Sequence, residues 1–343
     1  MEKTVHDRKQ KLIQGIRSYI LMISLIGMII IVSIIEPAFM TGENMVNILR
    51  QYSVIGVCAL GVTFVLIEGG MDLSLGSNVS LCSVVAISVM NYMDNIGLDT
   101  DVAAIFAIIL AVAVGFGVGL ANGTILAAVN GRMGESFIVT YSMQIMIAAV
   151  ALLVTGGQFR TADFDEGVYT SLGTGWWPII IFVLLIVILQ FVLTKTRFGR
   201  QVCYMGANMN AAKMSGINTR KLRPLNYGLC GACAGLAAIM VTARVTSASP
   251  LQGVGYELDA IAAAVVGGTS LTGGSGSIIK TALGVLVIAV LGNALNVMGV
   301  NANAQLVVRG AIIILAVGID VWNRQARKER SVRNEPSSAN ANV

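Results

Sequence analysis

The sequence predicts an all-α, polytopic membrane protein with about ten transmembrane helices. Of its 343 residues, 55% are hydrophobic and only 12% are charged, whereas a soluble domain has about 25% charged residues. Apolar stretches long enough to cross a bilayer recur along the chain. An outer-membrane barrel is excluded, because its strands alternate apolar and polar residues, whereas this chain contains unbroken apolar runs such as 102–110 and 179–189.

The apolar stretches place ten predicted spans. The first follows a polar stretch of 18 residues without a cleavage pattern behind it, so we expect a span rather than a signal peptide. The fourth is predicted to be long or bent, because four glycines lie within 115–123. The eighth has about 11 residues, too few to cross a core of about 30 Å. The ranges are 19–35, 46–67, 77–93, 102–129, 136–155, 177–193, 225–243, 257–267, 276–295 and 305–322.

The loop between the sixth and seventh predicted spans determines the expected orientation. It contains seven basic residues and no acidic residue: Lys195, Arg197, Arg200, Lys213, Arg220, Lys221 and Arg223. Short basic loops stay on the cytoplasmic side, and the loops after the first, third and fifth spans are acidic. The basic charge is therefore interpreted as an orientation signal, and no nucleic-acid partner is predicted.

This orientation divides the chain into three predicted regions. Residues 1–18 form a cytoplasmic N-terminal segment, and 19–322 form the transmembrane domain, with a cytoplasmic loop at 194–224. Residues 323–343 form a cytoplasmic, disordered tail. The first 18 residues and the tail each have a net charge of +3, which places both termini in the cytoplasm.

Two similar glycine-rich stretches interrupt the predicted helices 198 residues apart. Residues 69–77 read GGMDLSLGS and residues 267–275 read GGTSLTGGS, with five of nine positions identical. Glycine pairs break helices, and hydroxyl side chains can satisfy the freed backbone groups. Such breaks in two internally related halves indicate a transport pathway, with close helix packing as the alternative. The candidate pathway or gate residues are Gly69, Gly70, Asp72, Ser74, Gly267, Gly268, Thr269 and Ser270.

The span order puts both glycine-rich stretches on the same side of the membrane. That arrangement is typical of a parallel repeat, and the short eighth span leaves an inverted repeat open. Few ionisable residues lie near spans, and all are near predicted span ends or breaks, where long side chains reach water: Glu68, Asp72, Asp259, Lys280 and Arg309. This placement disfavours an ion-coupled carrier with carboxylates at the midplane.

No catalytic or metal site is predicted for this chain. The single histidine, His6, lies in the polar N-terminal stretch, and the five cysteines lack metal-site spacing. The chain has no glycine-rich phosphate loop ending in lysine and Ser or Thr. We therefore predict free thiols, no cofactor in this chain and no enzyme activity of its own.

Three motifs in order resemble the ribose-type permease subunits of bacterial ABC sugar importers: GGMDLSLGS, TRFGRQVCYMGANMNAAKMSGIN and GYELDAIAAAVVGGTSLTGGSGS. The resemblance covers about residues 45–322. It implies a subunit in the lipid of the bacterial cytoplasmic membrane that pairs with a second, identical or sibling, permease subunit. An extracytoplasmic binding protein would deliver a sugar or sugar-like solute, and a cytosolic ATPase would bind ATP and Mg²⁺. An ion-gradient-driven secondary transporter of a small polar solute is the alternative function, and a membrane scaffold or receptor without transport is a third.

The resemblance also implies a short coupling helix, at about 206–217, that rests in a cleft of the ATPase. The residues that match are Gly206, Ala207, Ala211, Ala212, Ser215, Gly216 and Ile217. The spacing of Ala207, Ala211 and Met214 predicts one face of a single helix, and Gly216 is a suitable C-terminal stop. A solvated basic loop is the alternative interpretation of this segment.

Overall fold

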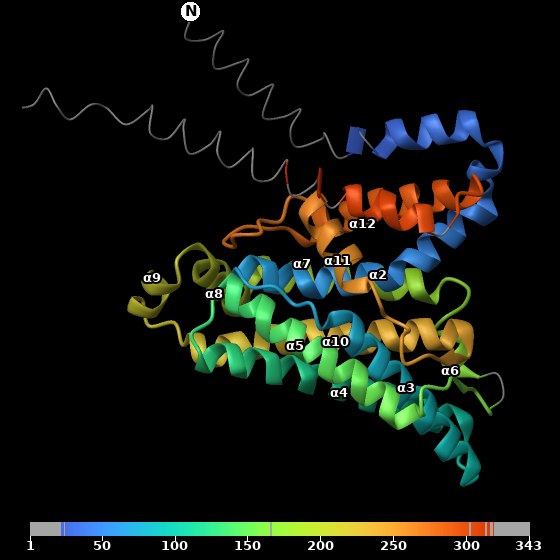
Figure 1. Ribbon diagram of the computed structural model, residues 1–343, viewed down its shortest axis with the longest axis horizontal. Coiled ribbons are helices and arrows are strands. Elements are labelled where there is room, and N and C mark those ends of the chain that lie inside the picture. The colour runs from blue at the N-terminus through green and yellow to red at the C-terminus, as the bar shows by residue number, and fades with distance from the viewer. Residues whose placement is uncertain are drawn as a thin grey trace, which may run out of the picture.

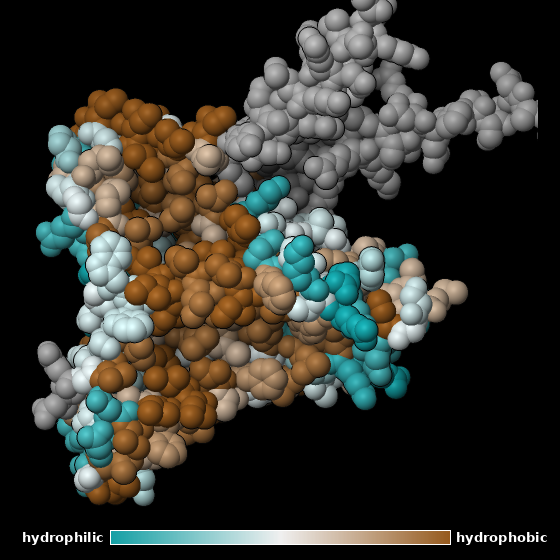
Figure 2. Space-filling view, turned by 180° about the vertical axis from the view of Figure 1, so that it is seen from behind, coloured by the Kyte–Doolittle hydropathy of each residue, from teal (hydrophilic) through white to brown (hydrophobic). Residues whose placement is uncertain are grey.

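The computed structural model is predominantly helical and describes residues 22–23, 25–164, 167–301, 303–312, 314–315 and 318. Within these residues, seven helices are long and apolar enough to cross a membrane, and they run alongside one another (Figure 1). Figure 2 shows a broad apolar band between two hydrophilic edges. The predicted all-α, polytopic class is confirmed. The seven helices are α2 (Gly42–Glu68), α3 (Leu75–Asn95), α4 (Thr100–Ala128), α5 (Met133–Thr155), α7 (Trp177–Lys195), α10 (Thr219–Val245) and α12 (Ile278–Val297).

The other described elements are short and include the predicted eighth span. This segment is α11, an 11-residue helix about 16 Å long, so it is too short to cross a bilayer, as expected. The first predicted span contains a helix at Leu25–Ile35, and the tenth contains helical residues at 303–312. The predicted segments at 1–18 and 323–343 lie outside the described residues. The short elements are η1 (Pro37–Met40), β1 (Arg160–Thr161), α6 (Val168–Ser171), α8 (Arg197–Ala207), α9 (Met209–Met214), β2 (Ser247–Ala248) and α11 (Tyr256–Val266).

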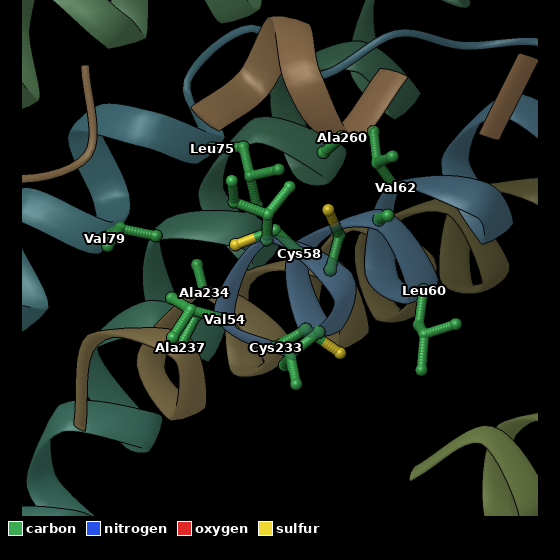
Figure 3. Close-up of a cluster of buried hydrophobic side chains, with 14 of the residues drawn as sticks. Val54, Cys58, Leu60, Val62, Leu75, Val79, Cys233, Ala234, Ala237 and Ala260 are labelled. Atoms are coloured by element: carbon green, nitrogen blue, oxygen red, sulfur yellow. The ribbon is translucent and has the colours of Figure 1, made fainter. Parts of the chain in front are cut away.

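Helix α2 forms the buried centre of the bundle. Every residue from Tyr52 to Glu68 is buried, as is typical of a helix that is apolar on all sides. Around it pack α7, α10, α11 and α12. Figure 3 shows Cys58 of α2 in a buried cluster with Leu75, Cys233 and Ala260. The most central span is thus surrounded by protein rather than lipid.

Helices α4 and α10 approach each other most closely, through glycines. A methyl group added to Gly115 or Gly119 of α4 would overlap backbone atoms of α10, and one added to Gly231 would overlap the Gly115 carbonyl. Glycines four residues apart allow this close backbone approach between membrane helices. Gly117 lies on another face, where an added methyl would meet no described atom within 4 Å. The predicted long span is a continuous 29-residue helix, and three of its four glycines serve packing.

The two ends of the bundle carry different short elements (Figure 1). At one end β1 pairs antiparallel with β2, and Asn91 Nδ2 donates to Asp163 Oδ2 over 3.1 Å. At the other end lie α8 and α9. Lys213 Nζ donates to Asn130 Oδ1 over 2.9 Å and joins α9 to the turn between α4 and α5.

Candidate translocation gate and coupling surface

The first glycine-rich stretch breaks the chain between α2 and α3. Gly69 adopts the left-handed conformation, with φ of 86°, and ends α2. Beyond it, Met71 N donates to Ser136 Oγ over 3.0 Å and Leu73 N donates to Thr140 Oγ1 over 3.1 Å. Tyr227 OH donates to the Met71 carbonyl over 3.2 Å. Hydroxyls therefore satisfy the freed backbone groups, as expected, but helices α5 and α10 supply them.

Asp72 and Ser74 lie inside this break, shielded from water. Asp72 is 2% exposed, and its Oδ1 accepts from Ser74 N and Ser74 Oγ over 3.0 and 2.7 Å. Asn122 of α4 donates to Ser74 Oγ over 2.7 Å. The expectation that Asp72 reaches water is wrong, because its carboxylate turns back onto its own loop. Asp72 and Ser74 therefore fix the break in position against α4, through the hydrogen bond from Asn122.

A buried ion pair sits where α2 ends. Arg223 Nε of α10 lies 2.5 Å from Glu68 Oε1, and the two residues are 5% and 2% exposed. Asn226 Nδ2 donates to Glu68 Oε2 over 2.6 Å, and Arg223 Nη1 donates to the Leu126 and Gly131 carbonyls over 3.2 and 2.7 Å. The expectation that Glu68 reaches water is therefore also wrong. The network joins α2, α10 and the end of α4.

Sequence reasoning missed this network because Arg223 was counted with the basic loop. The available signal was a carboxylate at the end of one span and an arginine at the start of another, on the same predicted side of the membrane. Opposite charges at equal depth are candidates for pairing, since neither is stable alone in a low-dielectric environment.

The second glycine-rich stretch follows α11. Gly267 ends the helix, and Gly268, Gly273 and Gly274 adopt positive φ. Thr269 is fully buried, with its hydroxyl 3.4 Å from Thr281 Oγ1, which in turn lies 2.9 Å from Thr63 Oγ1. Ser270 N donates to the Ser275 carbonyl over 3.0 Å. This stretch is therefore connected to α12 and α2.

The two stretches meet each other at one end of the bundle. Gly274 N donates to the Ile67 carbonyl over 2.8 Å, and a methyl on Gly273 would crowd Gly69. The prediction that both copies lie on the same side is confirmed. Both follow a helix that runs toward this end, as parallel copies would.

The end of α8 fills the remaining space between the two stretches. A methyl added to Gly206 would overlap both the Ile67 carbonyl and the Gly274 nitrogen. Three segments that are far apart in sequence are therefore in direct contact. Beside this junction lies a cavity of about 520 Å³. Its lining includes Glu68, Gly69, Arg132, Gly206, Arg223 and Thr272.

The predicted coupling segment forms two helices rather than one. Asn208 is extended, with φ of −158° and ψ of 103°, and separates α8 from α9. Its side chain caps α9 by accepting from Ala211 N over 3.0 Å, an N-cap that the single-helix interpretation overlooked. Ala207 therefore belongs to α8, and the prediction of one continuous helix face is wrong. Gly216 follows α9 with φ of 80°, which confirms it as the stop.

Most of the candidate coupling residues still share one surface. Ala207, Ala211, Ala212, Ser215 and Ile217 line a groove of about 500 Å³ between α8 and α9, together with Arg197, Arg200, Gln201, Tyr204 and Asn208. Met214 beside it is 90% exposed. A methionine this exposed at the end of a short helix is unusual, and it is typical of an interaction site.

The similarity to known proteins extends over most of the chain. The model of the family described as "Branched-chain amino acid transport system / permease component" matches residues 44–317. The ribose import permease protein RbsC of Escherichia coli (strain K12) is 39% identical over 309 residues, which cover 87% of this chain and 92% of that protein. RbsC of Bacillus subtilis (strain 168) is 38% identical over 298 residues, covering 85% and 89%.

A third relative is named for a different sugar. The galactose/methyl galactoside import permease protein MglC of Escherichia coli (strain K12) is 35% identical over 325 residues, covering 91% of this chain and 95% of that protein. No solved structure gives a significant match.

These similarities confirm the resemblance to ribose-type permease subunits of ABC sugar importers, and the seven apolar helices agree with a multi-pass protein of the bacterial cytoplasmic membrane. The chain belongs to the branched-chain amino acid transport system / permease component family.

Proposed function

We propose that this permease subunit pairs with a second one, identical or sibling, to form the translocation pathway for a sugar or sugar-like solute. An extracytoplasmic binding protein delivers the solute, and a separate cytosolic ATPase, which binds ATP and Mg²⁺, drives import. The relatives named for ribose and galactose import support the solute class, because they match over most of this chain.

The contact between α8 and the two glycine-rich stretches carries the proposal. Gly206 packs against Ile67 and Gly274 with no room for a methyl group. A displacement of α8 therefore displaces the end of α2 and the second glycine-rich stretch, because close-packed interiors transmit strain. The break before α3 and the break after α11 then form a two-state gate that the ATPase biases through α8 and α9.

The groove between α8 and α9 supports an ATPase docking role. Its alanines and Ser215 leave space for a partner's side chains, and Arg197, Arg200 and Tyr204 provide charged and aromatic contacts. Aromatic residues, methionine and arginine are enriched at protein interfaces. Met214 would enter the partner's surface beside the groove.

Replacing Met214 or Ala211 with glutamate is expected to weaken ATPase binding about tenfold or more, because each change places a charge in the desolvated part of the interface. The measurement is co-purification and ATPase stimulation in the complex with the binding protein. Ile96→Glu is the matched control: Ile96 is 62% exposed in the loop between α3 and α4, and its substitution should leave ATPase binding intact. Wild-type ATPase binding by both Met214→Glu and Ala211→Glu would contradict the docking assignment.

Thiol labelling tests the orientation on which this docking depends. Burial raises the pKa of the Cys203 thiol, so a new cysteine in a cysteine-free background is the better probe. Met214→Cys (90% exposed) is expected to react with a membrane-impermeant maleimide only in inside-out vesicles. Phe159→Cys, 70% exposed beside β1, should react only in intact spheroplasts. Labelling of Met214→Cys from outside would reverse the orientation.

Uptake in proteoliposomes tests the function itself. The complex with its ATPase and binding protein should accumulate radiolabelled D-ribose or D-galactose only when ATP is present inside the compartment that holds the ATPase. Accumulation by this chain alone without ATP would instead favour the secondary transporter. Glu68 and Asp72, the carboxylates at the first break in the described part of the chain, are both hydrogen-bonded there, which disfavours them as coupling groups for that alternative.

A further inference from the structure

Helix α5 has two flanks that carry different chemistry. Ser136 and Thr140 face inward and hold the break before α3. On the neighbouring flank, Phe137, Tyr141 and Gln144 follow at spacings of four and three residues, which align along one ridge of a helix. The rings of Phe137 and Tyr141 are 50% and 49% exposed and are stacked, with centroids 6.1 Å apart and planes at 12°.

The ridge formed by Phe137, Tyr141 and Gln144 ends beside a carboxylate that has one oxygen without a hydrogen-bond partner among the described residues. Glu257 of α11 is 6% exposed, and its Oε1 lies 3.4 Å from Gln144 Nε2, a long hydrogen bond. Its Oε2 is buried and has no hydrogen-bond partner among the described residues. The carboxylate lies against Gly76 of α3, where a side chain would overlap Oε2.

This site lies deep within the membrane-spanning part of the molecule. Gln144 is the twelfth residue of α5, so it lies about 17 Å from the start of the helix, near the middle of a hydrocarbon core of about 30 Å. A carboxylate with an empty acceptor site is costly at that depth. Such groups in membrane proteins face the bundle interior or a water-filled path.

The ridge and the carboxylate together fit a polyhydroxylated solute. The Glu257 carboxylate can accept hydrogen bonds from hydroxyl groups, while the Gln144 amide can both donate and accept. An exposed aromatic face offers a platform for the C–H face of a sugar ring. A few placed polar groups beside apolar surface are the usual composition of a small-molecule site.

We infer that the Phe137–Tyr141–Gln144 ridge and Glu257 form a solute-contact site halfway along the translocation pathway, with Glu257 accepting hydroxyls of a sugar whose ring stacks on Tyr141. The inference rests on the proposed function, because it places this flank of α5 on the pathway. It assigns a contact site near the midplane, next to the inner part of the first glycine-rich stretch, where Glu257 lies against Gly76.

The first experiment measures import by the complete complex with D-ribose and D-galactose as probes. Glu257→Gln keeps the size of the side chain against Gly76 and replaces one acceptor oxygen by a donor. It is expected to lower kcat/KM for import at least tenfold, with complex yield and basal ATPase rate unchanged. Tyr141→Ala should lower it by a similar factor and Tyr141→Phe much less. Wild-type kcat/KM in both Glu257→Gln and Tyr141→Ala would overturn the inference.

The second experiment does not depend on which sugar is carried. In the assembled, cysteine-free complex, Tyr141→Cys is compared with Met146→Cys. Tyr141 is 49% exposed and Met146 is 53% exposed, but the two residues lie about 140° apart around the axis of α5. A hydrophilic methanethiosulfonate should modify Tyr141→Cys at least tenfold faster. Equal rates, or no modification of Tyr141→Cys, would overturn the solute-facing ridge. If the wild-type complex imports neither sugar, the proposed function fails, while the labelling rates still decide whether the ridge faces water.

Discussion

Replacing Glu68 with leucine is expected to destabilise the subunit by about 3–5 kcal/mol, because Arg223 would remain buried without its partner. Arg223→Met should have a similar effect, since it leaves the Glu68 carboxylate buried. The double variant Glu68→Leu/Arg223→Met should recover most of the loss, because two apolar side chains replace two desolvated charges. Thermal or denaturant unfolding of the purified subunit in detergent measures all three.

The matched control for the ion pair lies at the other end of the same helix. Glu43→Leu is the same substitution at an exposed residue in the first turn of α2, and it should change the unfolding free energy by less than about 1 kcal/mol. A double variant as unstable as either single variant would contradict the pairing argument. Restored stability without restored import would assign the pair to the gate, because the pair lines the cavity at the α8 junction.

Replacing Gly119 or Gly231 with leucine is expected to destabilise the subunit by about 3 kcal/mol or more, because α4 and α10 would have to separate. At both positions the first added carbon already overlaps backbone of the facing helix, and backbone cannot move aside as a flexible side chain can. The expected result is little folded, monodisperse subunit after purification. Size-exclusion chromatography and the same unfolding assay measure it.

Gly117→Leu is the matched control within the same run of glycines. An added methyl there meets no described atom within 4 Å, and leucine has the higher helix propensity, so stability should be equal or slightly greater. If Gly117→Leu and Gly119→Leu are equally damaging, the effect comes from lost flexibility of α4. That result would contradict the conclusion that Gly119 is required for the close packing of α4 against α10.

Hydrophobicity and spacing predict most of the architecture. Seven of the ten predicted spans coincide with long apolar helices, and the predicted short segment at 257–267 is the short helix α11. Long apolar runs determine where helices form because the backbone must satisfy its own hydrogen bonds in lipid. The glycine-rich stretches at 69–77 and 267–275 also break the helices as expected.

Local patterns predict less about the candidate site. The spacing of Ala207, Ala211 and Met214 suggested one helix, yet the Asn208 side chain caps a new one. Glu68 and Asp72 were expected to reach water, yet Arg223 and Ser74 hold them inside. The roles of these residues in gating and coupling stay predictions that the experiments above address.

The sequence by itself determined the membrane-spanning class, the position of most helices, the two helix breaks and the family. These follow from local hydrophobicity, glycine content and motifs that neighbouring residues carry. Only the tertiary structure decided that Gly69, Gly206 and Gly274 meet at one junction, that Arg223 neutralises Glu68, and that Gln144 reaches Glu257. Such contacts join residues from about 70 to about 200 positions apart, and the packing of whole helices, rather than any local pattern, brings them together.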